Sequence, residues 1–151
     1  MKKIISLAVC FVMPFVLMGG AKTAEDTPPT TSAQAFVLYC PDNNTVICSK
    51  NADEKMKPAS TTKIMTSLIT LEEAASCNSE VIFKQEMVAE GSSMYLKVGE
   101  KVRLSDLASG MMMASGNDAA NAAAYTISGS PEKFSQRMNE KAEQIGMTNT
   151  H

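Results

Sequence analysis

A single β-hairpin ahead of a long helical region is the feature that most restricts how this chain can fold. Two β-prone runs, 35–40 and 45–49, flank the turn sequence Pro41-Asp42-Asn43-Asn44, in which Asn43 or Asn44 is expected to be left-handed. Two strands alone are marginally stable in water, so the hairpin needs further strands. Only the stretches 80–84 and 94–104 offer any. The sequence therefore predicts an α/β domain that is short of strands.

The residues from Ser60 onward are predicted to be mainly helical. Apolar residues at 64, 65, 68, 69 and 71 form one broad face, which is typical of a buried helix that ends near 72–75. Ser130-Pro131-Glu132 is typical of a helix start, and Gly146 is typical of a helix end. Further helices are predicted over 105–113, 118–127 and 131–145. The methionine run 111–113 is interpreted as core packing.

The first 21 residues have the pattern of a signal peptide. Lys2 and Lys3 precede an apolar run over 4–18, and small residues at Gly19 and Ala21 suit cleavage after Ala21. An uncleaved anchor is the alternative. The predicted organisation is a signal peptide over 1–21, a flexible polar linker over 22–33 and a domain over 34–151. An exported, extracytoplasmic protein is expected, and membrane tethering stays open.

The net charge argues against nucleic-acid binding, and the cysteine count argues against a set of fully paired disulfides. Removing residues 1–21 takes away two lysines, so the formal net charge falls from −2 to −4, and a mildly acidic chain without a basic cluster is not expected to bind nucleic acid. The three cysteines that remain, Cys40, Cys48 and Cys77, cannot all pair within one chain. Export permits a Cys40–Cys48 disulfide but does not require it. Small buried apolar residues are the alternative.

The available side chains restrict the chemistry. The only histidine is the last residue, His151, so a Ser-His-Asp or Cys-His arrangement would have to use that terminal residue. The cysteines lack metal-ligand spacing, and there is no glycine-rich phosphate loop. No metal and no cofactor are therefore expected. A serine nucleophile here would need another base, for which lysine is the obvious candidate.

Ser60 and Lys63 offer such a pair. Positions i and i+3 lie on one face of a helix, so the amine can reach the hydroxyl. A lysine acts as a base where desolvation and nearby positive charge favour its neutral form. Spacing alone decides nothing, because about one Ser-x-x-Lys is expected by chance in a chain of this length. Indeed, Ser130 and Lys133 have the same spacing, and Ser130 is interpreted as a helix cap.

The second candidate constellation is Ser115-Gly116-Asn117, at the break between two predicted helices. A hydroxyl and an amide in one glycine-containing turn can face the same cleft, where one relays a proton and the other holds a carbonyl or orients the lysine. A plain interhelical turn with Asp118 as a cap is the alternative. Ser76-Cys77-Asn78 has the same Ser-x-Asn spacing.

Four segments in order resemble the serine D-alanyl-D-alanine carboxypeptidases, which are low-molecular-weight penicillin-binding proteins of the β-lactamase-like fold. The segments are ADEKMKPASTTKIMTSLITLE, EGSSMYLKVGEKVRLSDL, GMMMASGNDAANAAA and FSQRMNEKAEQIGMTNTH. The resemblance, which covers roughly 35–151, implies that Ser60 is the nucleophile and Lys63 its base. It also implies that Ser115 passes a proton to the departing D-alanine and that Asn117 holds the substrate and the lysine.

The resemblance further implies the fold and the partners. The fold would be the helical half of the family's domain plus the N-terminal hairpin, without the C-terminal strands. The substrate would be a peptidoglycan stem peptide ending in D-Ala-D-Ala, and β-lactams would be inhibitors. The family's third motif, Lys-Thr-Gly or His-Thr-Gly, does not occur in the 151 residues. The chain alone is therefore expected to be C-terminally truncated, and unstable or inactive by itself.

Two other functions stay open at this point. A serine β-lactamase shares the early motifs and would turn over penicillin without releasing D-alanine from a peptide. A non-catalytic fragment that binds the cell wall would keep its binding in a Ser60→Ala variant.

Overall fold

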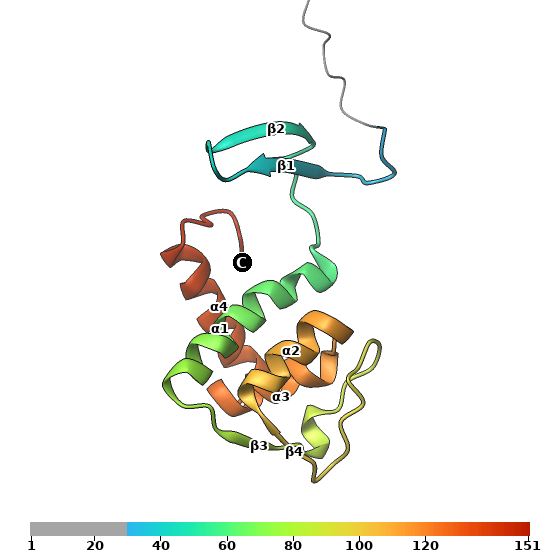
Figure 1. The fold of residues 1–151 in the computed structure, drawn as a ribbon, viewed down its shortest axis with the longest axis vertical. Coiled ribbons are helices and arrows are strands. Elements are labelled where there is room, and N and C mark those ends of the chain that lie inside the picture. Colours follow the sequence, from blue (N-terminus) through green and yellow to red (C-terminus); the bar gives the residue numbers. More distant parts are fainter. Residues whose placement is uncertain (1–29) are drawn as a thin grey trace, which may run out of the picture. The chain divides into compact units, whose positions relative to one another are not determined.

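The computed structural model describes residues 30–151, which fall into two units that divide after Lys55. The predicted signal peptide over 1–21 and most of the predicted linker lie outside the described residues. One unit contains the hairpin, and the other, residues 56–151, contains the helices (Figure 1). No helix among residues 30–151 is long and apolar enough to cross a membrane.

The hairpin forms as the sequence predicts. Strands β1 (Phe36–Cys40) and β2 (Thr45–Lys50) pair antiparallel, and Asn44 takes the left-handed conformation with φ of 54°. Leu38 lies opposite Cys48 but Tyr39 lies opposite Val46, so the register shifts by one residue between them. The three cysteines of the described residues are free, and Cys40 lies opposite Thr45. The Cys40–Cys48 disulfide is therefore not formed.

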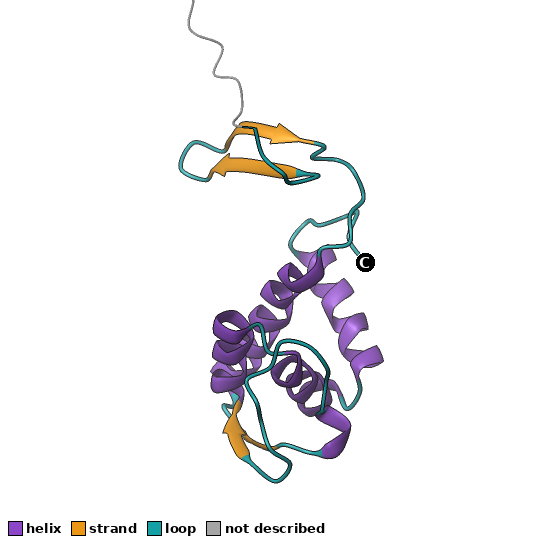
Figure 2. Cartoon of the chain, turned by 90° about the vertical axis from the view of Figure 1, so that its right-hand side faces the viewer, coloured by secondary structure: helices purple, strands orange, loops and turns teal. Residues whose placement is uncertain are grey.

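The second unit is a cluster of four helices with one small sheet. Strands β3 and β4 pair antiparallel, which confirms that the stretches 80–84 and 94–104 each contain a short strand. Helix α1 contacts the three other helices (Figures 1 and 2). The elements are η1 (Ala59–Thr61), α1 (Thr62–Ser76), β3 (Glu80–Ile82), η2 (Gln85–Met87), β4 (Lys101–Arg103), α2 (Leu104–Ala114), α3 (Asn117–Ser128) and α4 (Pro131–Gln144).

Small residues on α3 place this helix at the centre of the core. Ala119, Ala122 and Ala123 are fully buried, and methyl side chains let neighbouring helices approach closely because they fill little space. The largest fully buried apolar side chains come from α1, from α2 and from the segment after β3. They are Ile69, Phe83, Leu104, Leu107 and Met111.

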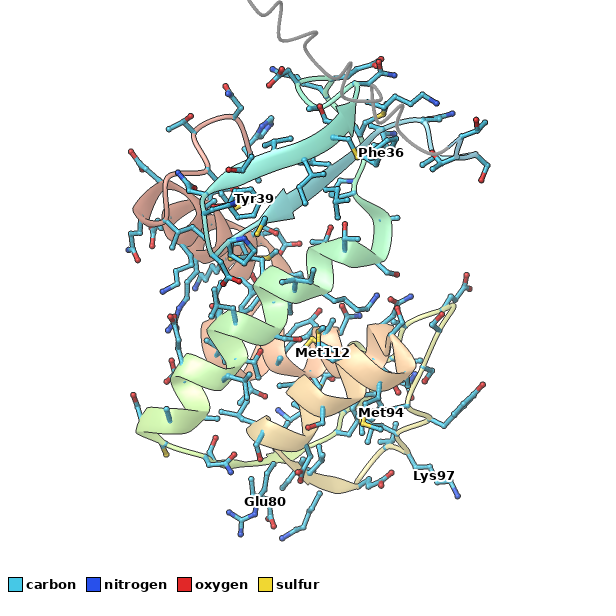
Figure 3. All side chains as sticks on the ribbon, turned by 45° about the horizontal axis from the view of Figure 1, so that its top comes forward. Phe36, Tyr39, Glu80, Met94, Lys97 and Met112 are labelled. Atoms are coloured by element: carbon cyan, nitrogen blue, oxygen red, sulfur yellow. The ribbon has the colours of Figure 1, made fainter. Side chains whose placement is uncertain are left out.

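The methionine run 111–113 divides between core and surface. Met111 is buried, as predicted, but Met112 and Met113 are 57% and 89% exposed. The core interpretation is therefore wrong for these two residues. Successive positions of a helix point about 100° apart, so three consecutive residues cannot share one buried face. Figure 3 labels Met112, one of the two exposed methionines, on α2.

Candidate active site

Ser60 lies at the start of the helical unit, in the 3₁₀ turn η1. No side-chain capping bond is recorded for η1 or for α1, whose N-cap residue is Thr61. Ser60 is exposed, and Lys63, in the first turn of α1, is half-buried. The Lys63 Nζ lies 3.4 Å from the Ser60 Oγ, a distance slightly longer than that of an ordinary hydrogen bond. Because no side-chain capping bond forms at the start of η1 or of α1, Ser60 does not serve as a helix cap.

The residue before Ser60 has an unusual backbone. Ala59 has φ of +46°, a left-handed conformation that costs a residue with a Cβ about 1–2 kcal/mol. Such strain persists where the surrounding structure imposes it, and it is enriched at functional sites. Here it makes a sharp turn immediately before the candidate nucleophile.

A cleft of about 480 Å³ lies between the start of α1 and the start of α3. It brings together three of the four site residues that the sequence predicts, Ser60, Lys63 and Asn117. Ser115 is not among its lining residues. The remaining lining residues are Ala59, Thr62, Thr66, Ala89, Ala120 and Asn121.

Two hydrogen bonds fix Asn117 at the edge of this cleft. Its backbone N–H donates to the Ser92 carbonyl at 2.7 Å, and its side-chain Nδ2 donates to the Glu90 carbonyl at 2.7 Å. A carbonyl oxygen only accepts, so the Glu90 contact assigns which end of the amide is NH₂. Among residues 30–151, the Asn117 Oδ1 and the second Nδ2 proton make no hydrogen bond.

Ser115 occupies the turn between α2 and α3. It caps the C-terminus of α2 in a left-handed conformation, with φ of 53°, and it is half-buried. The next residue, Gly116, is buried, and a Cβ there would lie 2.9 Å from the Asp118 Oδ1 and 3.2 Å from the Met94 nitrogen. The φ of −61° at Gly116 would suit any residue, so backbone conformation does not require glycine here. Glycine is required because a Cβ would be too close to Asp118 and Met94.

Asp118 does not cap α3 in the way that the plain-turn alternative supposed. It is the second residue of α3 and is 3% exposed. Its carboxylate accepts hydrogen bonds from the loop that precedes β4, at Ser93, Met94 and Leu96, and from the N–H of Ala119. Burial disfavours the charged carboxylate, but these bonds outweigh it and lower the pKa of Asp118 below its ordinary value.

Both look-alike motifs have structural roles. The Ser130 Oγ accepts from the Lys133 N–H at 3.3 Å at the start of α4, which confirms that Ser130 is a cap. Asn78 joins the end of α1 to the start of α2 through two hydrogen bonds with Ser105. With the same Ser-x-x-Lys spacing, Ser130 therefore caps a helix, whereas Ser60 lies near the amine of its lysine.

Thr66, Asn121 and Asp118 were not predicted as site residues. Thr66 and Asn121 line the cleft, and they follow the predicted site residues Lys63 and Asn117 by three and four positions. Helical spacing could have indicated them once the helices were placed. The Asp118 contacts span 22 to 25 residues, so no local pattern could have indicated them. Among the residues that the structure describes, no group of three His, Cys, Asp or Glu could hold a metal ion.

The loop glycine next to Asn117 offers a matched test. Gly91 has φ of +91°, and a Cβ there would lie 2.9 Å from the Asn117 Nδ2. We expect Gly91→Ala to lower the free energy of unfolding by about 1–2 kcal/mol from backbone strain and also to displace the Asn117 amide. Gly99→Ala is the control, because φ there is +90° but nothing lies within 4 Å of its Cβ. Urea unfolding measures the strain, and the side-chain NH₂ resonance of Asn117 in an NMR spectrum should shift only in Gly91→Ala.

The family model for D-alanyl-D-alanine carboxypeptidases (Peptidase_S11) matches residues 21–151. The chain belongs to this family. This confirms the family resemblance of the four sequence segments. The curated relatives of this carboxypeptidase family include DacF of Bacillus subtilis, which is 35% identical over 99% of this chain and 41% of its own length. DacC of Escherichia coli is 36% identical over 90% of this chain and 37% of its own length.

Solved structures show the same relationship in the fold. The D-alanyl-D-alanine carboxypeptidase DacD from Francisella tularensis has a TM-score of 0.75 and 37% identity, covering 82% of this chain and 31% of that one. Penicillin-binding protein 5 from Haemophilus influenzae has a TM-score of 0.74 and 32% identity, covering 83% of this chain and 39% of that one. The predicted fold class is confirmed, and the chain spans about two fifths of the length of the curated relatives named above.

Proposed function

We propose that the protein that contains these residues is a serine-type D-Ala-D-Ala carboxypeptidase. It would remove the terminal D-alanine from the stem peptides of peptidoglycan in cell-wall synthesis or remodelling. Its family membership supports this activity, and the predicted signal peptide supports an extracytoplasmic location in the cell envelope. The domain over 34–151 would be the N-terminal part of the catalytic domain.

One observation carries the proposal: the amine of the half-buried residue Lys63 lies 3.4 Å from the hydroxyl of the exposed residue Ser60, in a cleft that Asn117 also lines. Among residues 30–151, Lys63 forms no ion pair, and its one side-chain hydrogen bond goes to Ser60. A serine with an adjacent base is the arrangement that acyl transfer requires. His151 is not among the cleft residues.

The proposed reaction has two halves. The Ser60 Oγ attacks the carbonyl carbon of the D-Ala-D-Ala peptide bond while Lys63 takes the hydroxyl proton. The C–N bond then breaks, and Ser115 relays the proton held by Lys63 to the nitrogen of the departing D-alanine, so Lys63 is neutral again. This leaves an ester between Ser60 and the shortened peptide. Lys63 then takes a proton from water as the water oxygen attacks the ester carbonyl, and it gives this proton to the Ser60 Oγ as the ester bond breaks. The shortened peptide leaves as a carboxylic acid, which ionises in water.

Asn117 is proposed to position the reacting groups. Because the Glu90 carbonyl holds one Nδ2 proton, Asn117 would use its Oδ1 to accept from Lys63 and its second Nδ2 proton to donate to a substrate carbonyl. The N–H groups at the start of α1 would favour the negative charge that develops on the attacked oxygen. A β-lactam carbonyl would be attacked in the same way, leaving a penicilloyl ester on Ser60.

The function is tested with a pentapeptide ending in D-Ala-D-Ala and the protein as its gene encodes it. We expect release of free D-alanine, measured by chromatography, and no release from the same peptide ending in L-Ala-L-Ala. Labelled penicillin should accumulate as a covalent adduct. Rapid penicillin hydrolysis without D-alanine release would instead assign the protein to the β-lactamases and contradict the proposal.

A further inference from the structure

Asp118 is the most completely bonded side chain next to the cleft, although it does not line the cleft. Its Oδ2 accepts from the Ser93 Oγ at 2.6 Å and from the Leu96 N–H at 3.1 Å. Its Oδ1 accepts from the Met94 N–H at 3.0 Å and from the Ala119 N–H at 2.9 Å. A buried carboxylate with four donors is well satisfied and is costly to disturb.

The loop over 90–97 bends around this carboxylate. Met94 and Leu96 direct their N–H groups at Asp118, and Tyr95 between them has φ of 63° and is 84% exposed. The Tyr95 N–H donates to the Ser93 Oγ at 2.8 Å. Figure 3 shows Met94 beside α2 and Lys97 directed away from the helices. The carboxylate thus replaces the regular partners that the Met94 and Leu96 N–H groups would have in a strand or a helix, and the Ser93 hydroxyl does the same for Tyr95.

The same loop holds Asn117 from its other end. The carbonyls of Glu90 and Ser92 accept the two hydrogen bonds of Asn117. Asp118 accepts hydrogen bonds from Ser93, Met94 and Leu96. Two adjacent residues of α3, Asn117 and Asp118, therefore form hydrogen bonds with adjacent parts of the loop over 90–97. Gly116 lets the two segments approach, since a Cβ there would meet both the Asp118 Oδ1 and the Met94 nitrogen. A shift of the loop at Asp118 would carry the Glu90 carbonyl, and with it the Asn117 amide, out of place.

We propose that Asp118 is a positioning residue for the acyl-transfer reaction, acting with Ser93 to hold the loop over 90–97 so that Asn117 faces Lys63 and the substrate. The catalytic part of this inference rests on the proposed function. Asp118 itself is too deeply buried to touch a substrate. Its effect passes through the Glu90–Asn117 contact, where a displacement of about 1 Å can slow a reaction by about a hundredfold.

Asp118→Asn is the most informative variant because it keeps the shape. With its NH₂ in the place of Oδ2, it can donate to the Ser93 hydroxyl but leaves the Leu96 N–H without an acceptor. With its NH₂ in the place of Oδ1, it leaves the N–H groups of both Met94 and Ala119 without one. Asp106→Asn is the matched control, because the exposed Asp106 carboxylate accepts one backbone N–H, from Arg103, at the start of α2.

The experiment measures the rate of penicillin acylation per folded molecule, in the protein as its gene encodes it and well below its unfolding temperature. We expect Asp118→Asn to slow acylation about tenfold to a hundredfold and Asp106→Asn to leave it unchanged. Ser93→Ala should slow acylation less than Asp118→Asn does, and this variant decides the matter if Asp118→Asn does not fold. A purely structural role would lower the folded fraction and leave the rate per folded molecule at the parent value. That result would overturn the proposal.

Amide exchange provides a readout that does not depend on catalysis. In Asp118→Asn, the side-chain NH₂ protons of Asn117 should exchange faster and shift, and the Leu96 amide proton should lose protection. If the parent protein is not acylated at Ser60, the proposed function fails, but these signals still test the positioning of Asn117. Parent-like Asn117 signals in both Asp118→Asn and Ser93→Ala would contradict the inference, whatever the activity.

Discussion

Replacing Ser60 by alanine is expected to abolish covalent labelling by a penicillin, whereas Ser130→Ala should leave labelling at the parent level. The two serines share the Ser-x-x-Lys spacing, but only Ser60 lies within 3.4 Å of its lysine amine and lines the cleft. The Ser130 hydroxyl is occupied as the cap of α4. Loss of a nucleophile removes the ester-forming atom, so no slower route through the same residue remains. Mass spectrometry of the intact protein measures the adduct.

The matched pair separates chemistry from stability. Ser130→Ala should cost about 1 kcal/mol through the lost helix cap, so it tests whether slight destabilisation alone affects labelling. Ser60 makes no capping bond, so Ser60→Ala should leave urea unfolding nearly unchanged. A penicilloyl adduct that persists in Ser60→Ala, or that maps to Ser130 after proteolysis, would refute the assignment of Ser60 as the nucleophile.

Asp118→Ala is expected to be among the most destabilising single substitutions in residues 56–151. It leaves the N–H groups of Met94, Leu96 and Ala119 without their acceptor, and each buried unpaired group costs about 1–3 kcal/mol. Partial rehydration of the loop should offset some of this, so we expect a loss of about 3–5 kcal/mol in the free energy of unfolding. Asp106→Ala should cost far less, because the Asp106 carboxylate is exposed.

The same carboxylate predicts how stability depends on pH. The pKa of Asp118 is lower in the folded protein than its ordinary value of about 3.9, so folding favours the charged form. This contribution is fully present above the unfolded pKa and is lost as the pH falls through the folded one. Its four hydrogen-bond donors are one hydroxyl and three backbone N–H groups. None of them is charged, so the pH dependence comes from the Asp118 carboxylate and not from an ion-pair partner.

Urea unfolding between pH 6 and pH 2 would measure this effect. The parent should lose stability more steeply below about pH 4 than Asp118→Asn, which carries no titratable group at this position. Equal slopes for the two proteins in this range would show that Asp118 has the same pKa in the folded and unfolded states.

The sequence by itself predicted the elements. Hairpin turn residues, apolar periodicity and the Ser130-Pro131-Glu132 start act over a few residues, and the structure has β1, β2 and the four helices close to the predicted bounds. Local spacing also allowed a Ser60–Lys63 contact, since about one helical turn separates the two residues, but the same spacing at Ser130 and Lys133 forms a cap. The sequence also favoured lysine over histidine as the base for a serine nucleophile, because the only histidine is the last residue.

Tertiary structure alone decided which polar residues serve the cleft. Ser60 and Ser130 have identical spacing from their lysines, but only Ser60 lines a cleft to which α3 also supplies an asparagine. The placement of Asn117 and Asp118 depends on a loop 22 to 27 residues earlier in the chain. Such contacts form only when packing of the α3 alanines brings the loop and the turn together, so no short sequence pattern carries them.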